Sequence, residues 1–509
     1  MNMEYFDVVL FSPPSRMINH YRPPVSLLCV GGYLMHMGLK VRIIDVPIKK
    51  QIRDKEFRAN YELIVQDIRR QMIEDFKNLK TKIVGITCYS TEFVEVLTLI
   101  KDIKRIDPSV KIIIGGIHPT LMPTDFFEED TGADICVVGE GEITLYELVQ
   151  RILINPEKGF DDIKGIVFKD ELTKKVKINP LRPLVENLDD ISFSAYSLID
   201  MEYYTNASPY SIRGCYLRSM YALANRGCPF QCTFCVAKKL RECSGKGSPG
   251  RARSAGSLIS ELKELKHKYK IDAFYFIDDM FTIDKENVKE FCSRLGNENL
   301  NLLWGCNSRV STLDEELIEN MAKSGCIQID FGVERGSDQA LRFVKKGTTI
   351  KKIIETFDLC HKYGIRTFAN MLINVPGETE QDLTDILNLL DRIKPEVVFL
   401  NIFFPFPGTE IYENAPYKFK REEYYLLSQD IGTLLRTHPE KFRFVTHSVD
   451  MKKWESQNYR KYNSPLRNVI FHLSLRYWKT LLKSGSKMNY VKQFSLFANE
   501  FINQKFNPQ

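Results

Sequence analysis

Long apolar runs, cysteine and an excess of charge are all scarce in this chain of 509 residues. No uninterrupted apolar run approaches the roughly 18 residues of a membrane-spanning helix, so we expect no such helix. The opening residues lack the basic stretch and the long apolar core of a secretory signal. Twelve cysteines are too few for a disulfide framework in a chain of this length. We therefore expect reduced thiols and a cytosolic location.

The net charge of +6 is small but unevenly distributed. Residues 451–509 contain 11 basic and 2 acidic side chains. Within this tail, residues 468–482 have apolar side chains at helical spacing, so they could rest on anionic lipid and bring a lipid substrate to the protein. Packing against the rest of the chain is the favoured expectation for this helix. Because the signatures of nucleic-acid-binding modules are missing, we expect no nucleic-acid partner.

The first 150 residues alternate short strands with helical patterns. The expected strands are rich in Val and Ile and span residues 7–11, 40–46, 82–87, 111–115 and 134–138. A sequence of this kind predicts a doubly wound, Rossmann-like parallel sheet. The loops that follow the strands should then meet in one crevice, because ligands bind beyond the carboxyl ends of parallel strands.

A second alternating series follows a predicted hairpin (163–178) and a linker (179–194). Its expected strands span residues 220–225, 273–278, 302–306, 328–333, 367–375 and 396–404. Six strand–helix repeats predict an open, TIM-like barrel of six parallel strands. We therefore expect four regions: a Rossmann-like domain (1–155), hairpin and linker (156–213), barrel (214–410) and a helical, basic C-terminal region (411–509).

The sharpest chemical signal follows the first strand of the second series. Cys228, Cys232 and Cys235 lie in RGCPFQCTFC with C-x3-C-x2-C spacing. Three thiolates can bind three irons of an iron–sulfur cluster and leave the fourth iron open to another ligand. Structural zinc is the alternative, although such a site normally needs a second pair of Cys or His ligands at the spacing typical of zinc sites. Another thiol, Cys215, lies just before the barrel and could approach the site, although a buried thiol is the commoner role.

This triad, with Phe234 before its last cysteine, closely resembles the radical S-adenosylmethionine (SAM) superfamily. The N-terminal half resembles the cobalamin-binding domain of one subgroup, through PPVSLLCVGGYLMHMGLKVRIID, IIIGGIHPT, VVGEGEITLYEL and NLDDISFS. The resemblance implies that the three cysteines hold a 4Fe-4S cluster and that SAM chelates its open iron. An electron from the cluster would then cleave SAM to a 5′-deoxyadenosyl radical.

The same resemblance implies a set of SAM-binding residues at the ends of the barrel strands. They are Phe234, Asp279, Arg309, Glu334 and Asn370. Each has a plainer alternative: Asp278 and Asp279 could cap the next helix, and a lone Arg309 could form a surface ion pair. The sequence departs from the family at Asn374, where the family usually has glycine, and this puts the adenine contact there in doubt.

For cobalamin, the resemblance implies contacts in the loops after the N-terminal strands. The candidates are Thr87, Ser90, Thr91, Gly115, Gly116, His118 and Gly139. The Asp-x-His-x-x-Gly motif that supplies a histidine to cobalt is absent, because residues 45–50 read DVPIKK. A histidine that caps a helix is the commoner explanation for His118. A degenerate domain that no longer binds cobalamin is a further alternative.

The resulting functional hypothesis is a cobalamin-dependent radical SAM enzyme that methylates an unactivated carbon. Two alternatives remain at this point: an anaerobic oxidative cyclase or other radical rearrangement with the same cofactors, and a non-catalytic metal-binding regulatory protein. We expect a small-molecule or lipid substrate and a low-potential electron donor of the flavodoxin or ferredoxin type.

Overall fold

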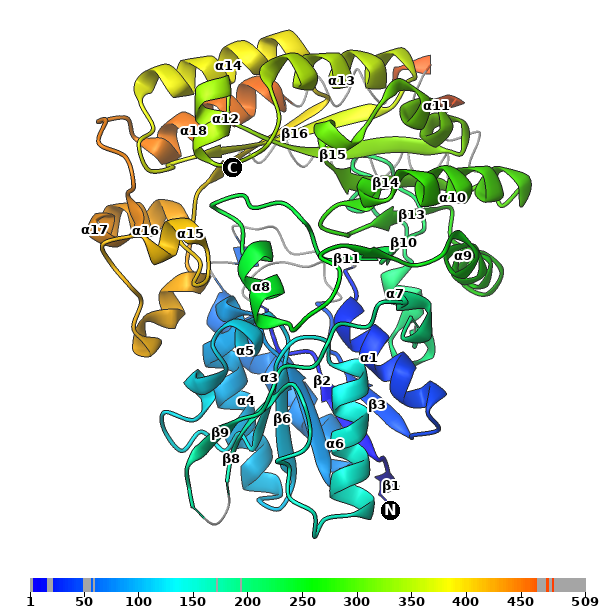
Figure 1. The fold of residues 1–509 in the computed structure, drawn as a ribbon, viewed down its shortest axis with the longest axis vertical. Helices are drawn as coiled ribbons and strands as arrows, with labels where there is room; N and C mark the ends of the chain where they lie inside the picture. Colours follow the sequence, from blue (N-terminus) through cyan, green and yellow to red (C-terminus); the bar gives the residue numbers. More distant parts are fainter. Residues whose placement is uncertain are drawn as a thin grey trace. The chain divides into compact units, whose positions relative to one another are not determined.

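The computed structural model (Figure 1) describes residues 3–15, 22–48, 56–57, 60–170, 173–192, 195–464, 473–475 and 478–479. The chain forms two compact units. The first contains Met1–Met201, Phe234–Pro249 and Pro405–Lys441, and the second contains Glu202–Thr233, Gly250–Phe404 and Phe442–Gln509.

The first unit is built on a seven-stranded sheet. Its parallel part has the order β3 (Val41–Ile44), β2 (Val8–Phe11), β5 (Ile83–Thr87), β6 (Lys111–Gly115) and β7 (Ile135–Val137). Two antiparallel strands, β8 (Ile166–Lys169) and β9 (Val176–Ile178), extend it beyond β7. All four residues of β2 are buried, as expected for a parallel strand covered on both faces. The order reverses between β2 and β5, so the loops after these strands flank the switch point where such sheets bind ligands.

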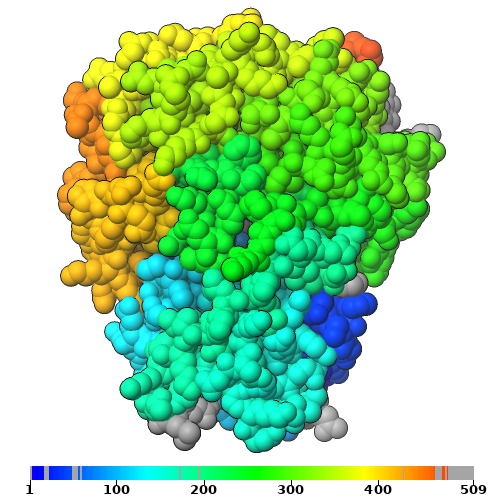
Figure 2. All heavy atoms as spheres, in the orientation of Figure 1, coloured from blue at the N-terminus to red at the C-terminus, as the bar shows by residue number. Residues whose placement is uncertain are grey.

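Helices cover this sheet on both sides (Figure 1). α1 (Val25–His36) packs on α6 (Glu142–Ile154), and α3 (Tyr61–Lys77) packs on α4 (Phe93–Ile106). Short elements complete the unit: β1 (Glu4–Tyr5), β4 (Leu79–Lys80), η1 (Ser90–Glu92), α5 (Ile117–Leu121), η2 (Pro123–Phe126), η3 (Leu188–Asp190), η4 (Tyr196–Leu198), α8 (Ala237–Cys243), α15 (Glu410–Glu413), η7 (Arg421–Ser428), α16 (Ile431–Thr437) and α17 (Pro439–Phe442). The segment that carries α8 reaches the face drawn in Figure 2.

The second unit contains six parallel strands in sequence order. They are β10 (Ser219–Ala222), β13 (Ala273–Phe276), β14 (Leu303–Ser308), β15 (Cys326–Glu334), β16 (Arg366–Ile373) and β17 (Val397–Ile402). Among the described strands β10 and β17 do not pair, so the barrel is open. Asn463 covers the edge at β17: its amide accepts from Val398 N at 3.0 Å and donates to Val398 O at 2.8 Å.

Five helices connect the barrel strands, and each begins with a capping side chain. They are α9 (Ala255–Tyr269), α10 (Lys285–Asn297), α11 (Glu315–Lys323), α13 (Ile350–Lys362) and α14 (Glu380–Ile393), capped by Ser254, Asp284, Asp314, Thr349 and Thr379. Each cap accepts a hydrogen bond from a backbone N–H of the first turn, which satisfies a donor that the helix cannot. The remaining elements are α7 (Met201–Tyr204), β11 (Asn225–Arg226), β12 (Arg251–Ala252), η5 (Phe281–Ile283), η6 (Val310–Thr312), α12 (Asp338–Phe343) and α18 (Met451–Tyr462).

The predicted fold class is confirmed, with differences at the connections. The hairpin, expected outside the first domain, adds β8 and β9 to the first sheet because β8 pairs with β7. The capping of α10 by Asp284 overturns the alternative in which Asp278 and Asp279 cap it. The amphipathic helix expected at 468–482 lies almost wholly outside the described residues. Across the part of the chain that was described, we found no helix with the length and apolar character needed to cross a membrane.

Candidate functional site

The cysteine loop leaves the barrel directly after β10 and β11, as the sequence predicted. Asp278, at the end of the neighbouring strand β13, holds its start: Oδ1 accepts hydrogen bonds from Ala224 N at 2.9 Å and Asn225 N at 2.7 Å. Burial raises the pKa of Asp278 to about 7, although the two backbone donors oppose this shift. A carboxylate on one strand therefore positions the loop that follows another.

Cys228 and Cys232 follow within the loop, and Cys235 comes just before α8. Cys232 is buried, whereas Cys228 and Cys235 are partly exposed. Burial raises the pKa of the Cys228 thiol; Asp279 adds to this shift and Arg309 opposes it. Across the described residues, no three Cys, His, Asp or Glu side chains are gathered closely enough to hold a single metal ion.

Arg309, directly after β14, lies against this loop. Its Nη1 donates to Cys232 Sγ at 3.3 Å, and its guanidinium carbon lies 3.6 Å from the centre of the Phe230 ring. The residue is only 6% exposed, yet its Nε and Nη2 have no hydrogen-bond partner among the described residues. The surface ion pair considered for Arg309 is therefore wrong. Two buried N–H donors beside the loop fit an anionic ligand, because unpaired buried donors are costly.

Glu334, the last residue of β15, forms a buried ion pair that the sequence did not reveal. Lys346 Nζ lies 2.8 Å from Glu334 Oε1, and both residues are buried. Glu334 adopts a φ of +70°, which turns the chain at the end of the strand. Gly332 makes room for the pair, because a Cβ there would overlap Glu334 Oε1 and lie 2.6 Å from Lys346 Nζ.

Asn374 adopts a backbone conformation that favours glycine. Its φ is +67°, in the left-handed region that asparagine tolerates better than most residues. Its side chain is fully buried: Nδ2 donates to Phe442 O at 2.7 Å, and Oδ1 accepts from Phe444 N at 3.1 Å. Asn374 therefore fastens a C-terminal segment to the end of β16. Nearby on β16, Asn370 is partly buried and donates to Phe331 O at 3.2 Å.

The other two predicted SAM-binding residues lie at the same loops. Asp279 directly follows Asp278 and is exposed. Desolvation by the surrounding protein nevertheless raises the pKa of its carboxyl group. Phe234 is partly buried and lies between Thr233 and Cys235.

Sequence reasoning missed a polar group on the inward face of the strands. Tyr275 Oη donates to Asn307 Oδ1 at 2.9 Å, and Gln328 Nε2 donates to Asp330 Oδ1 at 2.8 Å. Burial raises the pKa of Asp330 to about 6, and Arg213, with Nε 3.8 Å from Oδ2, opposes the shift. Strand alternation places Asp330, Gly332 and Glu334 on one face of β15. The two-residue period in QIDFGVE is the sequence pattern that could have indicated this shared face.

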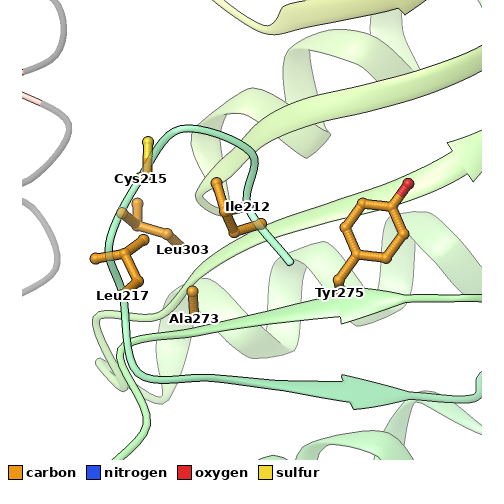
Figure 3. Packing of buried hydrophobic residues seen from close by; sticks show 6 residues of the cluster. All are labelled: Ile212, Cys215, Leu217, Ala273, Tyr275 and Leu303. Carbon is orange, nitrogen blue, oxygen red and sulfur yellow. The ribbon is translucent and has the colours of Figure 1, made fainter. Parts of the chain in front are cut away.

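Cys215 lies at the opposite end of the barrel from the cysteine loop. It packs with Leu217, Ala273 and Leu303, where Ala273 and Leu303 are the first residues of their strands (Figure 3). Tyr275 stands farther along its strand in the same view (Figure 3). Burial raises the pKa of the Cys215 thiol. The expectation that Cys215 could approach the active site is therefore wrong.

In the first unit, the predicted cobalamin residues lie at the carboxyl edge of the sheet. Thr87 and Thr91 flank the loop after β5, at the switch point, and both are partly exposed. Apart from its chain neighbours, no atom of the described residues lies within 4 Å of the position that a Cβ would take at Gly115, and the adjacent Gly116 is exposed. This open backbone, beside two hydroxyls, fits a bulky ligand that must approach the sheet closely.

Ser90 and His118 are buried just behind this edge. The His118 side chain is 0% exposed; its Nδ1 lies 3.0 Å from Ser90 Oγ, and its Nε2 lies 3.4 Å from Asp125 Oδ2. Both ring nitrogens thus face protein oxygens, so the histidine holds α5 against the loop after β5. Gly139 lies after β7 with a φ of +86°, and its backbone N donates to Thr120 Oγ1 at 3.1 Å.

Two family models match the chain, one on each of its two successive strand–helix series. The model described as B12 binding domain matches residues 18–149, and the model described as Radical SAM superfamily matches residues 224–390. The first match ends within α6, and the second starts just before the cysteine loop.

Similar proteins cover both regions. An uncharacterised methyltransferase of Pyrococcus horikoshii is 31% identical over 420 residues, which are 81% of this chain and 84% of the relative. The anaerobic magnesium-protoporphyrin IX monomethyl ester cyclase of Rubrivivax gelatinosus is 27% identical, over 77% of this chain and 66% of its own length. Among solved structures, the radical SAM methyltransferase TsrM of Kitasatospora setae, with cobalamin and a [4Fe-4S] cluster bound, is 19% identical. It superimposes with a TM-score of 0.63 and coverages of 80% of this chain and 77% of that chain.

Replacing Gly332 with alanine should weaken SAM binding. The new Cβ would displace the ends of the Glu334 and Lys346 side chains, and moving this carboxylate from its position should weaken binding by about tenfold, the equivalent of about 1.4 kcal/mol. Equilibrium binding of SAM to the anaerobically reconstituted protein measures the effect. Gly296→Ala is the matched control, because no atom lies within 4 Å of its new Cβ. Equal affinities for both variants would contradict the assignment of Glu334.

Replacing Asp278 with asparagine should remove a pH dependence of stability. The folded pKa of about 7 lies above the ordinary value of 3.8, so folding favours the protonated form and stability is lost as the pH rises from about 4 towards 7. The slope is roughly 1.4 kcal/mol per pH unit. Asp278→Asn, which keeps an acceptor for both backbone donors, should therefore gain stability relative to wild type at pH 8 compared with pH 5. Urea unfolding checks this, with the half-exposed Asp358→Asn as control; a pH-independent difference for Asp278→Asn would contradict it.

Proposed function

This chain belongs to the radical SAM superfamily, in the group with an N-terminal B12-binding domain, and from this premise we propose that it methylates an unactivated carbon of a small molecule. As a member of this family it is an enzyme that uses a 4Fe-4S cluster, SAM and cobalamin. When bound, the cluster and SAM supply a carbon radical that removes hydrogen, and cobalamin supplies the methyl group.

The cysteine loop and the strand ends beside it form the proposed radical-generating site. Cys228, Cys232 and Cys235 hold the cluster. Arg309 presents its two unpartnered N–H groups to the carboxylate of SAM, which is the anionic ligand that these buried donors fit. The Glu334–Lys346 pair, with Phe234, Asp279 and Asn370, positions the rest of SAM.

The carboxyl edge of the first sheet is the proposed cobalamin site. Gly115 and Gly116 let the ligand approach the backbone, and Thr87 and Thr91 offer hydroxyls at the switch point. Ser90 and His118 hold the loop in place from behind, and Gly139 completes the edge. Both nitrogens of His118 face protein oxygens, so we propose that this histidine does not bind cobalt.

The inward polar residues of the barrel are the proposed contacts of the substrate. Tyr275 donates a hydrogen bond to Asn307, Asn307 donates to Asp278 O, and Asp330 accepts from Gln328 on its own strand. Held in fixed positions, their side chains can orient a polar substrate without the loss of much conformational entropy. Asp330 shares the face of β15 that carries Glu334.

One observation carries the proposal of methyl transfer: the relative described as a methyltransferase is 31% identical across both regions of the chain. The cyclase relative, at 27% identity, supports the second candidate, an anaerobic oxidative cyclisation with the same cofactors. The proposal has two further elements. The cluster needs a low-potential electron donor, which we propose is of the flavodoxin or ferredoxin type, and the expected reduced thiols favour a cytosolic location. We favour packing of the basic C-terminal region on the protein over contact with a lipid surface.

Methyl transfer is tested with SAM labelled in its methyl group. The reconstituted enzyme, with cobalamin, a chemical reductant and a small-molecule cell extract as source of substrate, should form 5′-deoxyadenosine together with a labelled product. The matched control is the variant with all three cluster cysteines replaced by alanine, which should form neither.

The outcomes separate the two candidates. Formation of 5′-deoxyadenosine with an unlabelled product would reject methyl transfer and favour the cyclase. A labelled product from the cysteine variant would reject the assignment of the cluster to this loop.

A further inference from the structure

Arg309 joins a cluster-binding sulfur to an aromatic ring through one guanidinium group. Its Nη1 donates to Cys232 Sγ at 3.3 Å, and the Phe230 ring lies 3.6 Å below the guanidinium carbon. We propose that Arg309 sets the reduction potential of the cluster by donating this hydrogen bond. This role is separate from the binding of SAM and concerns the electron that the cluster accepts.

The electrostatic argument starts from the charge that reduction adds. An added electron makes the cluster and its thiolates more negative, and hydrogen bonds to the sulfurs, net charge and solvent exposure set the potential of such clusters. A cationic donor on Cys232 Sγ stabilises the reduced form more than the oxidised form. Because Arg309 is only 6% exposed, water screens this interaction weakly.

The arrangement differs from that of an arginine with a purely structural role. Arg335 is also buried in the same unit, and carboxylates neutralise its charge: it forms ion pairs with Glu378 and Asp382. Arg309 forms no ion pair with a carboxylate among the described residues, and the one hydrogen bond that its side chain makes there goes to sulfur. When SAM is absent, no carboxylate of the described residues pairs with this positive charge, so it acts on the cluster.

Phe230 fixes the geometry of the donor. The ring lies two residues before Cys232 in the same loop, so the stacked guanidinium and the sulfur that it contacts are held together. Stacking of a planar guanidinium on an aromatic face is a property that lysine does not share. A lysine at position 309 would keep the charge and lose the fixed direction of the hydrogen bond.

The proposal is tested by a redox titration followed by electron paramagnetic resonance. The full chain is loaded with its cluster and titrated without cobalamin, whose own signal would overlap. At a fixed potential, Arg309→Met should lower the ratio of reduced to oxidised cluster by about tenfold, a shift of about 59 mV to more negative potential. Arg309→Lys should shift it less in the same direction. Arg294→Met, which removes an exposed guanidinium from α10, is the matched control and should leave it unchanged.

An unchanged potential in Arg309→Met with full iron content would overturn the proposal. If that variant does not hold its cluster, the wild-type protein is measured instead, after labelling its arginines with 15N. Its reduced cluster should show a hyperfine coupling to arginine nitrogen, and Arg309→Lys should lack this coupling. Absence of this coupling in the wild type would overturn the proposal as well. The test does not depend on methyl transfer, because it needs only the cluster; failure to methylate a substrate would leave its result intact.

Discussion

Three cysteine thiolates on one short loop can bind three irons of a four-iron cluster, and this leaves one iron without a protein ligand. The chemistry proposed for the chain depends on that missing fourth ligand, because the open iron is where SAM binds. Residues around the loop hold it in position. Asp278 fixes the start of the loop through two backbone hydrogen bonds, and Arg309 places a buried positive charge against its second cysteine.

Parallel strands explain how residues so far apart in sequence come to one place. The carboxyl ends of neighbouring parallel strands meet at the same edge of a sheet, so the residues that follow β10, β13, β14 and β15 gather there. The first sheet uses the same principle at its switch point, between β2 and β5. In the second unit, caps such as Asp284 and Asp314 define where the connecting helices begin.

The strands could be predicted because buried parallel strands read as short runs rich in Val, Ile and Phe, with helical patterns between them. The cysteine loop could be predicted because its spacing is a local property. The Glu334–Lys346 pair could not, because its partners are twelve positions apart in sequence, with a helix between them. The role of Asn374 depends on Phe442 and Phe444, and no local pattern indicates a contact over that distance. The buried position of His118 likewise depends on Asp125 and Ser90.

The central claim is that one chain carries both cofactors, and the cofactor content of the purified protein tests it most directly. After anaerobic reconstitution with iron, sulfide and cobalamin, followed by removal of unbound material, Mössbauer spectroscopy and cobalamin extraction give both contents. The account predicts about four irons per chain in a cubane cluster, together with about one cobalamin per chain. A protein that retained stoichiometric zinc in place of iron, or a complete cluster with no cobalamin, would contradict it.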